Sequence, residues 1–209
     1  MVKLNGSVNC GFCQGVVKGD VYSPADSVAK VNIQVKDERK NPKTKKRPLY
    51  VLNFTAFDEN AHQLVKHCKA GDILFVRYHL DVKVNIDRHT GIGAFRDERI
   101  IDDVVLCKPS GKRTVANLNC GIFQGVFIGI TKQPNADNIY MVSVLEERSS
   151  DNSKLHQRFV VYGALGEFIE SNFTKGELVL VEYKIEKSKR LRPDGQADYF
   201  TNCVLEKIG

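Results

Sequence analysis

The sequence predicts an all-β protein made of two tandem copies of one five-stranded Greek-key barrel, each with one short helix. Three observations carry this prediction. A nine-residue phrase at 8–16 returns at 118–126 with six identical positions. Alternation of apolar and polar residues, typical of half-buried strands, recurs in both halves. The predicted elements also follow the same order in each half: three strands, one helix and two strands.

The repeat also predicts the division into domains. Its offset of 110 residues exceeds the roughly 20–50 residues of a solenoid unit and suits a small domain. We expect a first domain over 1–107, a linker over 108–115 and a second domain over 116–209. The linker combines Lys, Pro, Ser, Gly and Arg, a composition typical of loops. A content of 42% hydrophobic and 27% charged residues is ordinary for globular domains.

The first three strands follow from glycine placement and alternation. A strand containing glycines opens each copy, near 8–17 and 118–127. The second strand presents apolar residues on one face and polar residues such as Lys30 and Lys36 on the other. The third strand covers 50–57 and 156–162. The apolar positions of the second strand are Val31, Ile33 and Val35 in the first copy, and Tyr140, Val142 and Val144 in the second.

A change of period then predicts a helix in each copy. Asp58 is expected to cap the first helix, which ends before Gly71. The apolar residues recur at helical spacing. The fourth strand follows at 73–82 and 178–186, and the fifth at 100–107 and 199–206. This order is that of the OB-fold. The helical apolar residues are Ala61, Leu64, Val65 and Cys68, matched by Leu165, Phe168, Ile169 and Phe173.

Motifs for catalysis and metal binding are weak. There is no HExxH, P-loop, dinucleotide glycine pattern or nucleophile elbow, so we expect no enzymatic activity. Cys10 and Cys13 form a CxxC, but Phe123 takes the place of the second cysteine in the other copy. We interpret Cys13 as a core residue and expect neither metal nor cofactor. The six cysteines do not resemble a secreted disulfide framework.

Positive charge is concentrated in two segments. The net charge is +6, but 36–47 alone carries a net +5 and 184–192 a net +4. Such clusters on an otherwise balanced surface suit a polyanion, although basic loops are often merely solvated. No apolar run approaches the roughly 18 residues of a membrane span. No secretory leader precedes the first strand, so we expect a cytoplasmic protein.

The third strand is the best binding signal. In the second copy His156, Arg158 and Tyr162 share one face, and the first copy keeps an aromatic at Phe57. The alternative is that Tyr162 and Phe57 close the barrel end. Ligands of an OB-fold cross strands two and three between flanking loops. Both basic segments border that surface, and Phe95 with Arg88 and Arg96 repeats the aromatic and cationic mixture. The candidate nucleic-acid-binding residues are Arg158, Tyr162, His156, Phe57, Phe95, Lys36, Lys43, Lys45, Lys46, Arg47, Lys184, Lys187, Lys189, Arg190 and Arg192.

Three segments of the second copy resemble the bacterial-type single-stranded DNA-binding protein family. Residues 157–167 end a strand with an aromatic residue and Gly before a helix. Residues 175–183 make a Lys-Gly turn into a Val-x-Val-Glu strand, and 192–200 resemble the loop before the fifth strand. The resemblance covers most of 118–206 and extends more weakly to 8–107, where Asp58 replaces the Gly.

The resemblance implies sequence-tolerant binding of single-stranded DNA, with Tyr162 as a stacking aromatic and Arg158 as a backbone contact. It implies coating and protection of the strand during replication or recombination. Some members carry two OB-folds and dimerise, which implies a homodimer. The sequence lacks Trp, the usual stacking residue. It also ends without the acidic tail that recruits replication partners, so the resemblance does not extend to such partners. A phage or plasmid protein acting in a bacterial host would fit that pattern.

Two alternatives stay open at this point. The same surface chemistry permits an RNA-binding tandem OB protein, because recognition of the 2′-hydroxyl leaves no mark in this sequence. A protein-interaction or structural module is the second alternative, since the third strand of the first copy carries little charge.

Overall fold

The computed structural model describes residues 8–37, 40, 45–86, 93–107, 118–134, 136, 138–147, 154–191 and 195–209, with backbone only at 83–86, 93–96, 107 and 189–191. The chain divides into two compact units, Cys10–Cys120 and Met1–Asn9 with Gly121–Gly209. We call these the first and the second barrel. The predicted linker at 108–115 lies outside the described residues, so the domain limits stay a prediction.

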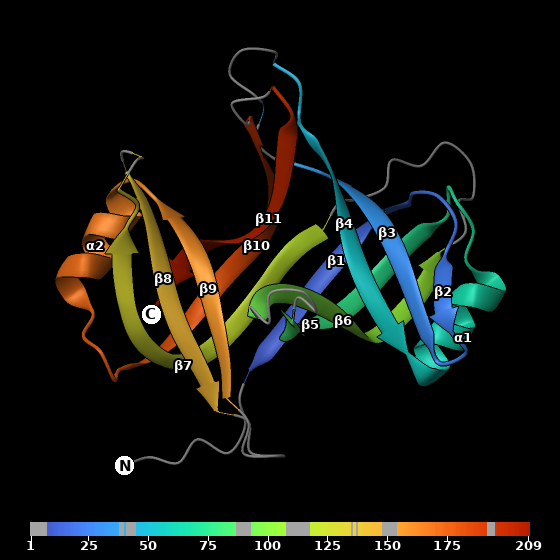
Figure 1. Cartoon of the computed structure of the whole chain (residues 1–209), viewed down its shortest axis with the longest axis horizontal. Helices are drawn as coiled ribbons and strands as arrows, with labels where there is room; N and C mark the ends of the chain where they lie inside the picture. Colours follow the sequence, from blue (N-terminus) through green and yellow to red (C-terminus); the bar gives the residue numbers. More distant parts are fainter. Residues whose placement is uncertain are drawn as a thin grey trace. The chain divides into compact units, whose positions relative to one another are not determined.

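The first barrel is a closed circuit of five strands with one added edge strand and a helix (Figure 1). Strand β3 pairs with β1 and β4, β4 pairs in parallel with β6, and β5 joins β6 back to β1. The short strand β2 pairs with β3 outside this circuit. The elements are β1 Asn9–Val17, β2 Tyr22–Ala25, β3 Val28–Lys36, β4 Leu49–Phe57, α1 Asp58–His67, β5 Ile73–Ile86 and β6 Gly93–Cys107.

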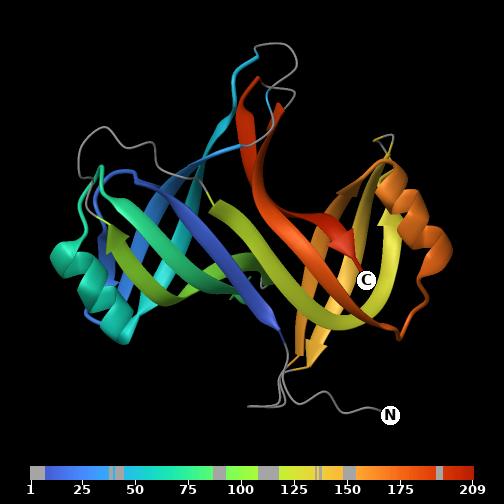
Figure 2. The same ribbon diagram turned by 180° about the vertical axis from the view of Figure 1, so that it is seen from behind.

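Within its described residues, the second barrel repeats the circuit and shows no edge strand (Figure 2). Strand β8 pairs with β7 and β9, β9 pairs in parallel with β11, and β10 joins β11 back to β7. This strand order and the helix after the third strand confirm the predicted OB-fold. The elements are β7 Leu118–Lys132, β8 Ile139–Glu147, β9 Lys154–Tyr162, α2 Ala164–Asn172, β10 Leu178–Leu191 and β11 Ala197–Ile208.

Each core is built around one fully buried tyrosine of the fourth barrel strand. Tyr78 makes an edge contact with Phe54 at 5.2 Å between ring centroids, and Tyr183 lies 5.5 Å from Phe159. The predicted inward faces of β3 and β8 are buried as well. Alternation on the strands therefore identified the core, because each barrel strand buries one face and exposes the other.

The glycines of the repeated phrase are explained by these cores. A Cβ at Gly11 would lie 2.2 Å from the Tyr78 ring, and a Cβ at Gly121 would lie 2.2 Å from the Tyr183 ring. A Cβ at Gly15 would lie 2.3 Å from the backbone oxygen of Gln34. The glycines of the repeated phrase are therefore required for close packing of the first strand of each barrel. This agrees with the interpretation of the phrase as a strand.

The helices differ from prediction in their details. Asp58 is the first helical residue, with φ +48°, and no side chain caps α1, so the predicted cap is wrong. The equivalent position in the second barrel is Gly163, with φ +60°. Only Gly adopts such angles without a steric cost, although Asp tolerates them better than most residues. Val65 and Phe168 are half exposed, because each short helix buries only a narrow stripe.

The predicted fourth strand of each barrel ends too early, at residues 82 and 186. Strands β5 and β10 continue to Ile86 and Leu191, and the red β10–β11 ribbon projects beyond its barrel (Figure 2). In β10 the apolar alternation stops after Ile185, where the ribbon leaves the core, while backbone pairing with β11 continues to Leu191. Among the described residues, neither helix is long and apolar enough to cross a membrane.

Candidate nucleic-acid interface

The outer face of β8 and β9 carries the predicted binding residues of the second barrel. His156, Arg158 and Tyr162 are exposed and alternate with buried neighbours on β9. Across the strand pair, Arg158 faces Ser143 and Tyr162 faces Ile139. Lys154 lies at the end of the same row and contacts the Glu147 carboxylate at 3.2 Å. The structure therefore brings an aromatic ring, an imidazole and a guanidinium onto one solvent-facing strip.

The outer face of β3 and β4 is the equivalent surface of the first barrel. Lys30 and Lys36 are exposed on β3, and Asn53 of β4 donates a hydrogen bond to the Asn32 side chain opposite. Phe57 occupies the position of Tyr162, and each of these two rings has 43% of its surface exposed. The sequence shows little charge on the third strand of the first copy, which is β4; the lysines of this face belong to the neighbouring strand β3.

The equal exposure of Phe57 and Tyr162 bears on whether these rings close the barrel ends. In the second barrel the end is filled by Ile169 of α2 and by the Tyr140 ring, against which Gly166 packs without room for a Cβ. In the first barrel Ala61 and Leu64 of α1 are buried in the corresponding place. The helices close the barrels, and both aromatic rings project outward instead.

The basic segment at 36–47 joins β3 to β4. Lys36, Lys45, Lys46 and Arg47 are exposed, whereas Lys43 lies outside the described residues. The base of this loop is closed by the Asp37 amide, which donates to the Pro48 carbonyl at 2.8 Å, and by the Tyr50 hydroxyl, which donates to the Asp37 carboxylate at 2.7 Å. The loop therefore starts from a fixed point beside the outer face.

The β10–β11 ribbon carries the second basic segment. Lys187 lies over the Tyr199 ring at 5.9 Å, and Tyr199 is 62% exposed. Both residues continue the parity of Tyr183 and Ile185, so they occupy the core face of the strands where the ribbon has left the core. Lys189 and Arg190 belong to β10 but are described by backbone only, and Arg192 lies outside the described residues.

Tyr199 is a candidate that sequence reasoning missed. Lys189 pairs with Tyr199 in the second barrel, and Val84 pairs with Phe95 in the first. Both hairpins contain a bulge at the same place, between Arg77 and Tyr78 or between Glu182 and Tyr183. Val84 and Lys189 each lie six residues after the tyrosine at the bulge, so their partners Phe95 and Tyr199 occupy equivalent positions. The side chain of Phe95 is not described. The connection from the fourth to the fifth strand is one residue shorter in the second barrel, so no single offset along the sequence aligns both strands.

Lys184 differs from the other candidate cations. Its ammonium contacts Glu206 at 2.8 Å and Glu186 at 3.1 Å, and the side chain is only 15% exposed. Burial alone would lower the pKa of Lys184, but hydrogen bonds to Glu206 and Glu186 and their charges raise it above its ordinary value. Two carboxylates therefore already neutralise this cation within its own barrel.

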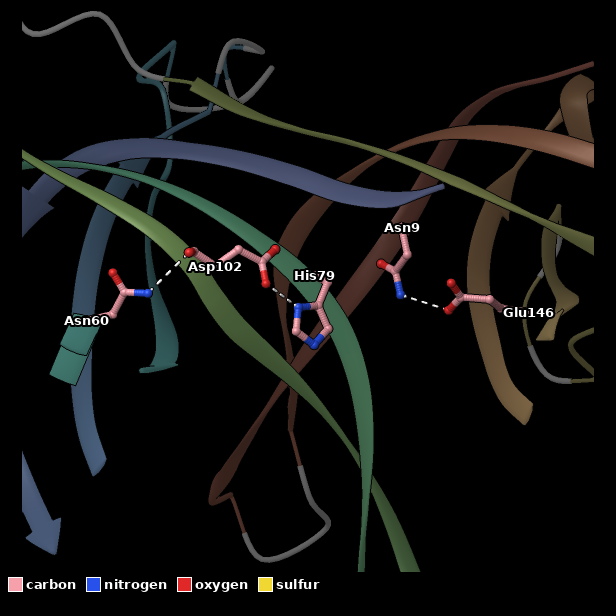
Figure 3. A network of polar contacts seen from close by, with 5 residues as sticks. All are labelled: Asn9, Asn60, His79, Asp102 and Glu146. Carbon is pink, nitrogen blue, oxygen red and sulfur yellow. Dashed lines mark hydrogen bonds and ion pairs between the residues drawn. The ribbon is translucent and has the colours of Figure 1, made fainter. Parts of the chain in front are cut away.

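The first barrel has a matching pair at the same bulge. Nδ1 of His79 lies 2.6 Å from Oδ1 of Asp102, and the Asn60 amide of α1 donates to the Asp102 backbone oxygen at 3.2 Å (Figure 3). His79 and Asp102 occupy the positions of Lys184 and Glu206 relative to the bulge. A pair repeated in both copies points to a structural role for Lys184 at the bulge.

The CxxC does not form a chelating pair. Cys13 is fully buried on the inward face of β1, and Cys10 lies on the opposite face, three residues away. Burial raises the pKa of Cys13 to about 12, so the thiolate that binds metals is disfavoured. Phe123 is equally buried at the matching position. In the part of the chain that the structure describes, His, Cys, Asp and Glu side chains form no group suited to a metal ion.

Comparison with known proteins gives a fold relationship without a sequence match. No protein-family model and no curated protein matches the sequence. A deletion variant of the single-stranded DNA binding protein from Thermus aquaticus superposes with a TM-score of 0.74 at 12% identity, covering 99% of this chain and 95% of that one. The wild-type Thermus aquaticus protein gives 0.71 at 14% identity, covering 97% and 92%. The chain therefore shares, along nearly its whole length, the fold of single-stranded DNA-binding proteins.

Proposed function

We propose that this protein binds single-stranded DNA without strong sequence preference and coats it during replication or recombination. The observation that carries the proposal is the pair of equally exposed rings, Phe57 and Tyr162, each ending the third strand of an OB-fold. Bases of any sequence can stack on such rings, and one stacked base contributes about 1–3 kcal/mol. Arg158 and His156 on the same face supply contacts to phosphate or base.

The cations around these faces support a polyanionic ligand. Lys30, Lys36 and the loop residues Lys45, Lys46 and Arg47 are exposed on the first barrel. On the second barrel Arg158 is exposed on the β8–β9 face, and Lys187 is partly exposed on the β10–β11 ribbon against the Tyr199 ring. Each phosphate that such a cation neutralises releases counterions, so affinity should fall steeply as salt rises. No chemical step forms part of the proposal.

The direct test is fluorescence anisotropy with labelled oligo-dT, oligo-rU and a matched duplex across a salt series. We expect oligo-dT to bind at moderate salt much more tightly than the duplex, because paired bases cannot stack on the rings. Equal binding of duplex and oligo-dT would reject the proposal. Tighter binding of oligo-rU would assign the same face to RNA. Absence of binding to all three would favour a protein-interaction module.

The face itself is tested by Arg158→Ala combined with Tyr162→Ala. We expect oligo-dT affinity to fall about 10- to 100-fold, from the loss of one stacked base and one charged contact. Phe168→Ala is the matched control, because Phe168 is an exposed aromatic that belongs to α2, not to β8 or β9, and its ring packs against Phe173. Unchanged affinity in the double variant would move the binding surface elsewhere.

The homodimer that the family resemblance implies is part of the proposal. Exposed apolar side chains on the outer face of β7 and β10, namely Ile122, Leu178 and Leu180, are a surface on which a second copy could pack. Light scattering of the purified protein at several concentrations measures this directly. A mass of one chain at every concentration would reject the dimer.

A further inference from the structure

The first barrel has an edge strand, β2, that the described part of the second barrel does not repeat. Strand β2 pairs with the first half of β3, while β1 pairs with the second half. It therefore widens the β3–β4 sheet on the side where Phe57 lies. All four residues of β2, Tyr22–Ala25, are exposed.

The register of β2 shows which way Tyr22 projects. Tyr22 is directly opposite Lys30, and residues paired across antiparallel strands project from the same face. Lys30 alternates with the buried Ala29 and Val31, so this is the outer face of the sheet. Tyr22 is 64% exposed, a larger fraction than that of any other large apolar side chain in the described residues.

The connection between β2 and β3 is held in place at several points. The Ser23 hydroxyl lies 2.9 Å from the Ala25 carbonyl oxygen and 3.1 Å from that of Val28, with geometry to donate to either. The Ser27 carbonyl accepts a hydrogen bond of 2.9 Å from the amide of Asp58, the residue after Phe57. These bonds fix β2 relative to the end of β4. Tyr22 is thus presented from a paired strand.

The edge of β2 is poorly suited to recruiting another strand. Pro24 lies in the middle of β2 and has no N–H to donate, a device that blunts edge strands against pairing. Strand addition by a protein partner is therefore disfavoured. The feature that remains is the ring of Tyr22, presented beside the Lys30 ammonium on the same face as Phe57.

We propose that Tyr22, with Lys30 beside it, is a second nucleobase-stacking position of the first barrel. Strand spacings of about 4.8 Å and a rise of about 3.3 Å per residue put the Tyr22 and Phe57 Cα atoms roughly 12 Å apart. At that separation the two rings can hold different nucleotides of one strand. This inference rests on the proposed single-stranded DNA binding and deepens it.

The nearby charges predict how Tyr22 contributes. Asp20 and Asp26 flank β2, and Lys30 is the cation paired across from Tyr22. Stacking at Tyr22 therefore adds affinity without neutralising a phosphate of its own. We expect Tyr22→Ala to weaken oligo-dT binding about 5- to 100-fold and to leave the salt dependence unchanged. Lys30→Ala should reduce the slope of log affinity against log salt by about 0.7.

Tyr22→Phe is the matched variant, because it keeps the ring and removes only the hydroxyl. We expect its affinity to equal that of the wild type. Wild-type affinity in Tyr22→Ala would overturn the inference, and equal losses in Tyr22→Ala and Tyr22→Phe would replace stacking by a hydroxyl contact. Far-ultraviolet circular dichroism of both variants verifies that neither substitution has disrupted the fold of the barrel.

A fluorescence experiment reports the contact directly, because the sequence contains no Trp. Tyr22→Trp introduces a single Trp, which can be excited separately from the remaining Tyr residues; oligo-dT should quench its fluorescence by stacking and duplex DNA should not. Phe168→Trp on α2 is the control and should stay unquenched. If oligo-dT binds and Tyr162→Ala weakens it, while Tyr22→Trp shows no quenching, this inference fails and the proposed function stands. If oligo-dT does not bind at all, the proposed function fails.

Discussion

At the scale of single residues, the repeated phrase shows why a conspicuous motif need not be a site. Its glycines are required because Tyr78 and Tyr183 lie where a Cβ would be. The cysteine at position 13 and its counterpart Phe123 are both fully buried in the core. Chemical patterns such as CxxC are therefore best interpreted together with strand parity. Here parity places the two thiols on opposite faces.

Gly11→Ala tests this packing argument. The added methyl group must displace the Tyr78 ring from a filled core, so we expect the free energy of unfolding to fall by roughly 1–3 kcal/mol. Urea denaturation followed by circular dichroism measures the change. Cys10→Ala, at the neighbouring residue on the opposite face, should change stability far less. A Gly11→Ala midpoint equal to that of the wild type would show that Tyr78 can move without cost.

At the scale of elements, the β-bulge of the fourth and fifth strands organises both the structure and the site. It places His79 against Asp102 and Lys184 against Glu206. Beyond it, the β10–β11 ribbon leaves the core: the strand face that buries Tyr183 and Ile185 carries the partly exposed Lys187 and the exposed Tyr199. Two lysines three residues apart on one strand are thus expected to have different roles.

Comparison of Lys184→Ala with Lys187→Ala tests this difference. Removal of Lys184 leaves Glu186 and Glu206 without their shared cation, so we expect a stability loss of about 1 kcal/mol with unchanged salt dependence of DNA binding. Removal of Lys187 should lower the salt slope by about 0.7 and change stability by less than about 0.5 kcal/mol. Urea titration and anisotropy against salt provide the two readouts. Reversed results would exchange the two roles.

At the scale of the whole molecule, the two barrels share a fold and differ in their surfaces. The first presents Phe57, Tyr22 and lysines of β3, and the second presents Tyr162, Arg158 and the ribbon residue Tyr199. If both barrels bind one strand, the second contact becomes intramolecular and strengthens the first. An oligonucleotide too short for both gains nothing from this effect.

A length series of oligo-dT tests the use of both barrels. One OB-fold covers about 4–16 nucleotides, so affinity should rise at least about 100-fold once the oligonucleotide exceeds that range. Phe57→Ala and Tyr162→Ala should each reduce this increase, whereas neither alone should abolish the binding of short oligonucleotides. If affinity stops rising at the oligonucleotide length that one barrel covers, and only one of these variants lowers it, binding would be assigned to a single barrel.

The sequence by itself determined the duplicated all-β architecture and the identity of the core. Alternation and the change to helical period are local properties of the chain, and the inward residues of β3 and β8 followed from them directly. The sequence predicted the start of the first helix less accurately. Asp58 does not cap α1, because its backbone has a positive φ, as does Gly163 at the equivalent position of the second barrel.

Only the tertiary structure decided which side chains are available on the surface. The ion pairs of Lys184, the register that makes Tyr199 the counterpart of Phe95, and the edge strand carrying Tyr22 depend on contacts between strands far apart in sequence. The exposure of a side chain and the neutralisation of its charge depend on the residues of the neighbouring strand. A one-residue bulge changes which residues those are. Core residues are specified by local pattern, whereas the binding surface is specified by pairing.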